Sequence, residues 1–111
     1  MSLSSVENFF ETDIRSGTIV AVEAFPKARK PAWKLTIDFG SDLGFKRSSA
    51  QIVQLYSAEN LVGRQVLAVV NFPPRQIADF ISEVLVLGLE TPDGVVLLQP
   101  ERPVENGVRV S

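Results

Sequence analysis

The sequence predicts an all-β fold, a small five-stranded barrel with a short N-terminal helix and extra C-terminal strands. Short apolar stretches recur along the chain and are separated by turns rich in Gly, Pro, Asn and Asp. One long connection, residues 51–63, interrupts this succession, as expected for a barrel with a single crossover between its third and fourth strands. The length of 111 residues fits one domain, residues 1–111, that is large enough to bury a core.

The N-terminal segment predicts a short helix. Ser4 and Ser5 are candidate N-caps, and residues 6–11 follow them with an acidic residue in the first turn. Phe9 and Phe10 are adjacent, so one helix cannot direct both rings into the same core. One of the two rings is therefore expected to pack elsewhere, for example across a subunit boundary.

Four strands are expected in the middle of the chain. Residues 14–25 are rich in β-branched side chains, and Gly17 favours a bend or bulge within them. Residues 33–39 alternate apolar and polar side chains, which is typical of a half-buried strand, and residues 45–50 follow after a turn. Residues 65–72 are almost continuously apolar, which favours a central strand, and the two prolines after them end its ladder.

The C-terminal third predicts a helical turn at 75–80 and the fifth strand at 81–89. A hairpin turn at 91–94 leads into a short strand at 95–98, and a closing strand is expected at 108–110. The expected core consists of Ile19, Val20, Leu35, Ile37, Val66, Ala68, Val70, Leu85 and Leu87.

The composition excludes most catalytic chemistry. The chain has no Cys and no His, which removes disulfides, thiol nucleophiles, Ser-His-Asp triads and ordinary transition-metal sites. It contains no glycine-rich dinucleotide or P-loop motif. No apolar run approaches the roughly 20 residues of a membrane helix, and the N-terminus shows no secretory signal. We therefore expect a cytoplasmic protein that is not an enzyme, has no cofactor or metal, and does not insert into membranes.

Positive charge is concentrated in one fifth of the chain. Residues 25–47 hold six of the eleven basic residues against two acidic ones, although the net charge of the whole chain is −2. Because local potential matters more than net charge, this block can bind phosphates; the alternative is a solvated hairpin. The cations expected to contact RNA in the first case are Lys27, Arg29, Lys30, Lys34, Lys46, Arg47 and, outside the block, Arg75.

The positions of three side chains in this block can be argued from strand alternation. Lys34 alternates with core positions and is expected to point outward, whereas Lys46 and Arg47 are neighbours, so only one of them can share its face. Trp33 opens the same strand, where an aromatic ring most often belongs to the core, although its place between two lysines also suits stacking on a base.

The segment Asn-Phe-Pro-Pro-Arg at 71–75 is unusual. Its two prolines fix the backbone after a buried strand and would hold Asn71 and Arg75 in place at the strand end. The alternative is a stiff exit loop with no binding role.

Several strings occur in the order found in a known family. They are Asp-Ile-Arg-Ser-Gly-Thr-Ile at 13–19, Asp-Phe-Gly at 38–40, Leu-Val-Gly-Arg-Gln-Val at 61–66 and the segment at 71–75. Over essentially its whole length the chain resembles the tRNA-binding OB-fold family, which includes a free-standing tRNA-binding protein and the C-terminal extensions of some methionyl-tRNA synthetases. The string Ser-Ser-Ala-Gln-Ile at 48–52 is most similar to the export-related chaperones of that family.

The resemblance implies an OB-type barrel with two kinds of ligand. One is tRNA or another structured RNA, with Asn71 and Ser82 joining the basic contacts. The other is an unfolded or precursor polypeptide bound by a chaperone of protein export, with contacts expected at Trp33, Phe72, Pro73 and Pro74. A pure polypeptide-binding secretion chaperone with little RNA affinity is the alternative.

The resemblance also implies a homodimer, because members of the family pair through their terminal segments. In this chain these are residues 1–12 and 90–111, and the expected interface residues are Phe9, Phe10, Val95 and Val96. An apolar surface of this kind on a small barrel marks an interaction site.

Overall fold

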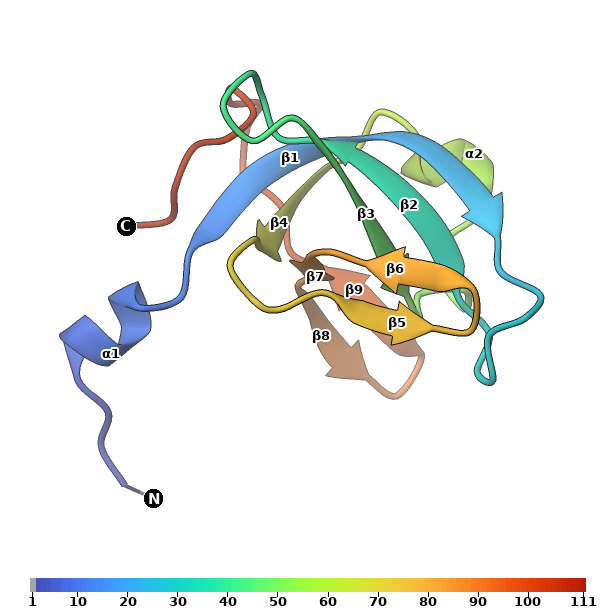
Figure 1. Cartoon of the computed structure of the whole chain (residues 1–111), viewed down its shortest axis with the longest axis horizontal. Helices are drawn as coiled ribbons and strands as arrows, with labels where there is room; N and C mark the ends of the chain where they lie inside the picture. Colours follow the sequence, from blue (N-terminus) through green and yellow to red (C-terminus); the bar gives the residue numbers. More distant parts are fainter. Residues whose placement is uncertain (1) are drawn as a thin grey trace.

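An antiparallel sheet that curls into a nearly closed barrel dominates the computed structural model, which describes residues 2–111 (Figure 1). Within these residues the sheet has five strands in the order β3-β2-β1-β4-β7. Their bounds are β1 (Ile14–Ala24), β2 (Trp33–Asp38), β3 (Phe45–Ala50), β4 (Gln65–Val69) and β7 (Leu85–Val86). The predicted all-β, five-stranded barrel is confirmed.

The barrel closes where β3 meets the residues just before β7. The backbone N–H of Glu83 donates to the carbonyl oxygen of Arg47 over 2.8 Å. The hydroxyl of Ser48 donates to the carbonyl oxygen of Val84 over 3.0 Å. These two bonds replace a regular ladder between the first and last strands of the sheet, so the sheet edges satisfy each other rather than facing water.

The main core follows from the alternation along the strands. Leu35 and Ile37 on β2, Ile19 on β1 and Val66 on β4 are fully buried, as expected. Gly17 is not the predicted bulge. It lies where a Cβ would come within 2.7 to 2.8 Å of the side chains of Ile37 and Phe39, so its role is to let the core approach β1 closely.

The bulge lies three residues later, and it corrects one predicted core position. The register between β1 and β2 shifts between Ile19 and Ala21. Val20 is consequently turned outward and is 42% exposed rather than buried. Downstream of the bulge, Val22 pairs with Leu35 and packs against the core again.

The segment after β4 differs most from expectation. Residues 75–80 do not form a helical turn; β5 (Arg75–Ile77) and β6 (Phe80–Ser82) form a hairpin, with Ala78 at a φ of 55° in its turn. The predicted strand 81–89 is divided into β6, β7 and β8 (Gly88–Thr91). The division shifts the alternation by one residue.

This shift reassigns the apolar side chains of the last barrel strand. Val84 is buried and Val86 packs against the core, whereas Leu85 is 49% exposed and Leu87 is only partly buried. A one-residue shift moves each side chain of a strand to the other face. Val70, also expected in the core, is partly buried at its edge.

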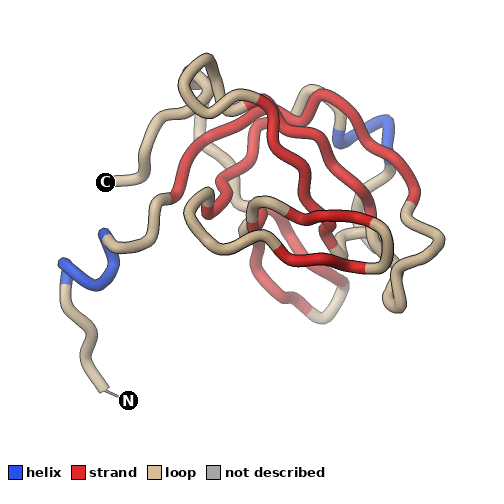
Figure 2. The backbone as a smooth tube through the Cα atoms, in the orientation of Figure 1, coloured by secondary structure: helices blue, strands red, loops and turns tan. Residues whose placement is uncertain are grey.

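The predicted N-terminal helix is confirmed, and a second short helix lies in the crossover. Ser5 caps α1 (Val6–Phe10) by accepting a hydrogen bond from the N–H of Asn8, and every residue of α1 is exposed on an arm that extends away from the barrel (Figures 1 and 2). In the crossover, α2 (Ala58–Leu61) buries Leu61 and is followed by Gly63 at a φ of 90°.

The C-terminal region contains a hairpin and a bridge. β8 pairs with β9 (Gly94–Leu97) around the predicted turn at 91–94. The closing strand expected at 108–110 is reduced to one bridge between Arg109 and Arg15 of β1. Among residues 2–111, no helix is long and apolar enough to cross a bilayer.

Candidate nucleic-acid interface

Two basic side chains share the outer face of β2 and β3. Leu35 and Ile37 point into the barrel, so Lys34, one residue before Leu35, points outward. Arg47 pairs with Thr36 and lies on the same outer face, whereas Lys46 pairs with the inward-facing Ile37. Of the two neighbouring cations on β3, Arg47 is therefore the one that lies with Lys34.

Both of these cations pack against Phe80 of β6. The Lys34 Nζ lies 5.7 Å from the Phe80 ring centroid and 5.1 Å from that of Phe25. The Arg47 Cζ lies 4.6 Å from the Phe80 ring centroid. These distances are within the range of cation–π contacts. We call Lys34, Arg47 and the Phe80 ring beneath them the cation face.

The Phe80 ring belongs to a second, smaller core. Phe25, Ala32 and Phe80 are buried together, and the Phe25 and Phe80 ring centroids are 5.3 Å apart. Ala28 and Ile77 pack against them. This cluster joins the loop between β1 and β2 to the β5–β6 hairpin, which lies in front of the barrel in Figure 1.

An ion pair joins the same loop and hairpin at the surface. The Lys27 Nζ lies 2.9 Å from Asp79 Oδ2. This hydrogen bond lowers the pKa of the Asp79 carboxyl below its ordinary value; burial opposes the shift, and the charges of Lys27 and Lys34 add to the lowering. Lys27 is thus held beside the cation face.

Two carboxylates accompany Arg47. Glu23 Oε1 lies 3.2 Å from Arg47 Nη2, and Glu23 is also the β1 residue directly opposite Lys34 in the ladder. Glu83 Oε1 accepts a hydrogen bond from the backbone N–H of Arg47 over 3.0 Å. A phosphate approaching the cation face would therefore compete with the Glu23 carboxylate for the Arg47 guanidinium.

The remaining predicted cations are more scattered. Arg29, Lys30, Lys46 and Arg75 form no ion pair with any residue of the described chain 2–111. Lys30 lines a separate open groove of about 440 Å³ with Gln54 and Glu90. Arg75 is exposed at the start of the β5–β6 hairpin. The structure therefore brings Lys27, Lys34 and Arg47 together and places Lys30 and Lys46 elsewhere.

Three predicted ligand contacts have structural roles. The Trp33 indole N–H donates to the Tyr56 carbonyl oxygen over 3.0 Å, and its ring packs against the main core. The Ser82 hydroxyl accepts from the Ser49 backbone N–H over 3.0 Å at the barrel seam. Asn71 uses both ends of its amide to tie β4 to the N-terminal segment. Phe72, Pro73 and Pro74 are exposed on the adjoining loop.

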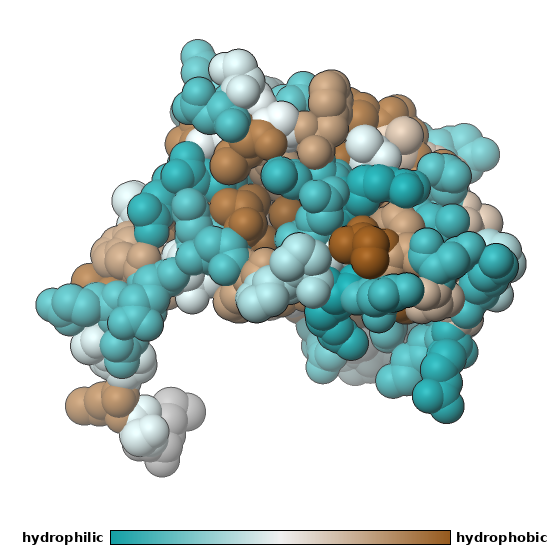
Figure 3. Space-filling view, viewed as in Figure 1, coloured by the Kyte–Doolittle hydropathy of each residue, from teal (hydrophilic) through white to brown (hydrophobic). Residues whose placement is uncertain are grey.

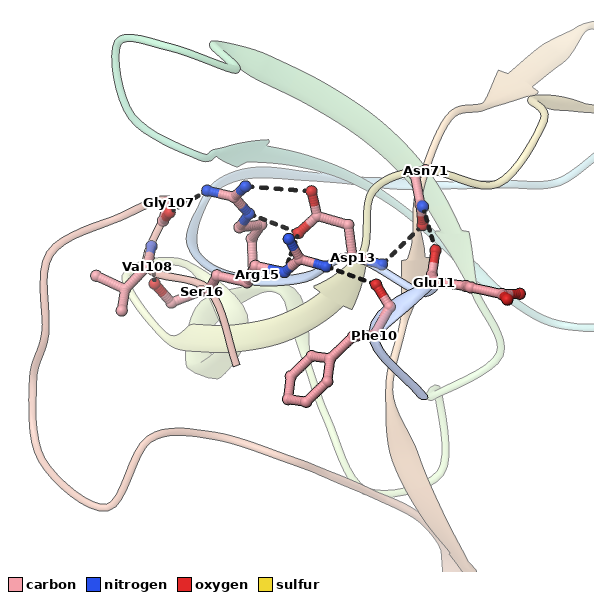
Figure 4. A network of polar contacts seen from close by, with 9 residues as sticks. Phe10, Glu11, Asp13, Arg15, Ser16, Asn71, Gly107 and Val108 are labelled. Atoms are coloured by element: carbon pink, nitrogen blue, oxygen red, sulfur yellow. Dashed lines mark hydrogen bonds and ion pairs between the residues drawn. The ribbon is translucent and has the colours of Figure 1, made fainter. Parts of the chain in front are cut away.

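The arm is rooted by a network that sequence reasoning did not find (Figure 4). Arg15 donates from Nε to Asp13 Oδ1 over 2.6 Å and from Nη2 to Asp13 Oδ2 over 3.2 Å. Arg109 donates to the Phe10 carbonyl oxygen over 2.8 Å, and its Nε lies 3.5 Å from Asp13 Oδ1. We call Asp13, Arg15 and Arg109 the terminal clasp.

The clasp alters the titration of its own members. The hydrogen bond from Arg15 lowers the pKa of the Asp13 carboxyl; burial opposes this, and the charges of Arg15 and Arg109 reinforce it. Asp13 thereby raises the pKa of Arg15. The predicted interface residues lie at the two ends of the chain: Phe9 and Phe10 are exposed on α1, whereas on β9 Val95 is partly buried and Val96 is exposed.

Sequence reasoning also missed Glu23, Asp79 and Phe80. Phe80 stands in an apolar stretch that suggested only a strand, and its contacts come from two other strands. The one available signal was the pattern of acidic residues beside the basic block. Without the register of the strand pairs, this pattern indicates only surface charge.

Comparison with known proteins gives consistent matches over the whole barrel. Residues 14–109 match the family model described as a putative tRNA binding domain. The chaperone CsaA from Bacillus anthracis is 50% identical, with a TM-score of 0.92 over 99% of this chain and 100% of that one. CsaA from Picrophilus torridus is 49% identical, with a TM-score of 0.94 over 98% and 100% of the two chains.

Two further relatives are named as methionyl-tRNA synthetase or as related to it. A MetRS-related protein from Pyrococcus horikoshii is 28% identical, with a TM-score of 0.87 over the full length of both chains. A methionine–tRNA ligase from Porphyromonas gingivalis is 37% identical over 105 residues, which is 94% of this chain. The chain spans only 15% of the length of that ligase.

Proposed function

The chain belongs to the tRNA-binding domain family, and from this premise we propose that it is a non-catalytic cytoplasmic protein that binds tRNA or a similarly structured RNA. The observation that carries the proposal is the cation face, where Lys34 and Arg47 from two strands lie over one ring with Lys27 beside them. OB folds bind nucleic acids on the face of their second and third strands and on the adjacent loops. The loop 25–32 and the β5–β6 hairpin occupy those loop positions here.

Phosphate contacts have a measurable signature. With about four phosphates engaged, the logarithm of the affinity should fall with the logarithm of salt concentration at a slope of roughly −3 to −4. Replacing Lys34 and Arg47 together by Gln should make that slope shallower by about two. A slope unchanged by the double variant would show that RNA, if bound, is bound elsewhere.

Arg102→Gln provides the matched control for this titration. Arg102 is an exposed arginine paired with Glu101 on the C-terminal segment, beside Gln65 rather than beside β2 and β3. Its replacement removes the same charge from a different surface, so the slope should stay as in the unmodified protein. Circular dichroism and thermal unfolding of each variant should be measured to check that the barrel is intact.

A second candidate function is the binding of unfolded or precursor polypeptides as a chaperone of protein export. Phe72, Ile81, Leu85 and Leu89 are all exposed, within one stretch of chain around the hairpin. Figure 3 shows a hydrophobic spot over the β5–β6 hairpin with hydrophilic residues around it. Two CsaA structures matched above carry the description chaperone.

The two functions differ in their response to salt. Capture of an unfolded polypeptide through apolar side chains should persist at salt concentrations that abolish RNA binding. Phe72 with Pro73 and Pro74 are the exposed members of the predicted polypeptide contacts, whereas Trp33 packs inward. Polypeptide capture without salt-sensitive tRNA binding would favour the pure secretion chaperone.

We also propose a homodimer. The chain exposes 7305 Å², whereas a compact monomer of 12.2 kDa exposes roughly 6,000 Å². Every residue of α1 is exposed, and its Phe9 and Phe10 suit a partner surface. Light scattering at micromolar concentration should give twice the chain mass, and a mass near 12.2 kDa would contradict the dimer.

A further inference from the structure

We propose that Phe80 is a positioning residue, whose ring holds Lys34 and Arg47 side by side as one phosphate-binding pair. The inference rests on the RNA-binding function proposed above and names a part of that site. It assigns the β5–β6 hairpin the task of carrying an aromatic ring beneath two cations that belong to different strands.

The contacts of Phe80 support this assignment. The side chain is only 3% exposed, yet Lys34 Nζ at 5.7 Å and Arg47 Cζ at 4.6 Å both lie within cation–π distance of its ring. Long basic side chains lose rotamer freedom when they bind a ligand. Because the ring already restricts both side chains, part of that loss has occurred before a phosphate arrives.

The ring itself is fixed from several sides. Phe80 pairs with Ile77 across the hairpin, packs on Phe25 at 5.3 Å between ring centroids, and is buried with Ala32. The base of the hairpin is attached to β3 through the Ser82 hydroxyl and the Ser49 N–H. A ring held this way can orient two flexible side chains without moving itself.

Polar contacts at the hairpin turn also help to fix the hairpin beside the cations. Asp79 precedes Phe80 and binds Lys27 of the β1–β2 loop, so the loop and the hairpin are joined by an ion pair as well as by the ring. Glu23 binds Arg47 from the β1 side. In the free protein the Glu23 carboxylate therefore contacts the guanidinium that the pair would offer to a phosphate.

A double-mutant cycle on tRNA affinity tests the positioning role. Phe80→Leu keeps an apolar side chain but removes the ring, and it should weaken tRNA binding about fivefold in the unmodified protein. In the Lys34→Gln/Arg47→Gln background the same substitution should change the affinity less than twofold. Equal losses in the two backgrounds would show that Phe80 only fills space, and would overturn the inference.

Phe25→Leu is the matched control, because Phe25 lies near Lys34 and packs in the same cluster. Its effect should be additive with Arg47→Gln, whereas the effect of Phe80→Leu should not be. Additivity in both pairs would contradict the assignment. If Phe80→Leu fails to fold, Phe80→Met replaces it in the same cycle.

One measurement needs no substitution at all. The ring current of Phe80 should shift the side-chain protons of Arg47 upfield in the NMR spectrum of the free protein, because Arg47 lies over that ring. Unshifted Arg47 resonances would overturn the inference.

The cycle separates the inference from the function on which it rests. If Lys34→Gln/Arg47→Gln leaves tRNA binding unchanged, the proposed RNA site is wrong and the positioning role with it. If that double variant weakens binding but Phe80→Leu costs the same in both backgrounds, RNA binding stands and only the positioning role is lost.

Discussion

The terminal clasp and the cation face both pair arginine with a carboxylate, yet the two regions are built differently. In the clasp, Asp13 is 22% exposed and accepts two hydrogen bonds from Arg15, while Arg109 adds its charge. On the cation face, Glu23 is 60% exposed and makes one contact with Arg47. The number of contacts and their burial, not the residue types, therefore distinguish a structural ion pair from one that a ligand can displace.

Backbone contacts add to the difference. Arg15 also donates to the Gly107 carbonyl oxygen over 3.0 Å, and Arg109 donates to that of Phe10. Arg47 instead rests on an aromatic ring, which restricts it without using its N–H groups. The clasp arginines thus use their N–H groups in bonds that hold the fold together, whereas Arg47 retains N–H groups that can donate to a phosphate.

The largest effect is expected from Asp13→Asn. It leaves Arg15 and Arg109 without their shared carboxylate in a partly buried network, so the free energy of unfolding should fall by about 2 kcal/mol. Urea denaturation monitored by Trp33 fluorescence measures it. Glu23→Gln is the control and should lie within about 0.5 kcal/mol of the unmodified protein. Similar losses for both variants would show that the two ion pairs contribute equally to stability.

Acidification should erase the difference made by Asp13→Asn. The pKa of Asp13 is lowered in the folded protein, so its carboxylate stabilises the fold above the ordinary value of 3.8, and this stabilisation is lost as pH falls through the lower, folded-state value. The unfolding free energies of the two proteins should therefore converge as the pH falls from 3.8 through the lower, folded-state pKa of Asp13. If the difference in unfolding free energy between the two proteins stayed constant down to pH 2, the titration of Asp13 would not be its cause.

A smaller effect of opposite sign is expected at the cation face. Glu23→Gln removes the carboxylate that competes for Arg47, so tRNA affinity at low salt should rise about threefold. Filter binding or fluorescence anisotropy measures it. Glu105→Gln, on the C-terminal segment, removes an equal charge away from the face and should change the affinity less. Weaker binding by the Glu23 variant would mean that this carboxylate helps to place Arg47.

The smallest effect is expected from Asp79→Asn. The Lys27–Asp79 pair is more than half exposed on both sides, so the free energy of unfolding should stay close to that of the unmodified protein. Freed from Asp79, Lys27 should raise tRNA affinity by about twofold. Thermal unfolding measures the change in stability, and the same binding assay measures the change in affinity. A loss of stability as large as that of Asp13→Asn would show that the Lys27–Asp79 pair is a structural ion pair like that of the terminal clasp.

Much of the barrel could be predicted from local pattern, and the failures arise where pairing between strands overrides that pattern. The alternation in β2 correctly gave Leu35 and Ile37 as core, because a regular strand has a strict period of two. Val20 was wrong because a bulge is set by how β1 pairs with β2. Leu85 and Leu87 were wrong because the chain breaks its strand near Glu83, where it bonds β3 instead.

The candidate site was less predictable than the fold. The outward direction of Lys34 followed from the alternation, but its partnership with Arg47 required the β2–β3 register. Phe80 could not be assigned, because the hairpin that carries it was expected as a helical turn. Its turn residue Ala78 has a positive φ without being Gly or Asn, the residues that signal such turns.

The terminal clasp also has a consequence for how the strands of the barrel could be reconnected along the chain. Arg109 bonds to Phe10, and the N–H of Val110 donates to the Ile14 carbonyl oxygen over 2.8 Å, so the chain enters and leaves the barrel at one point. A few residues would join these positions covalently, and new ends could be opened at the exposed Pro92–Asp93 turn. Such a circular permutant would keep every strand pair while removing the arm, which separates what the barrel does from what α1 does.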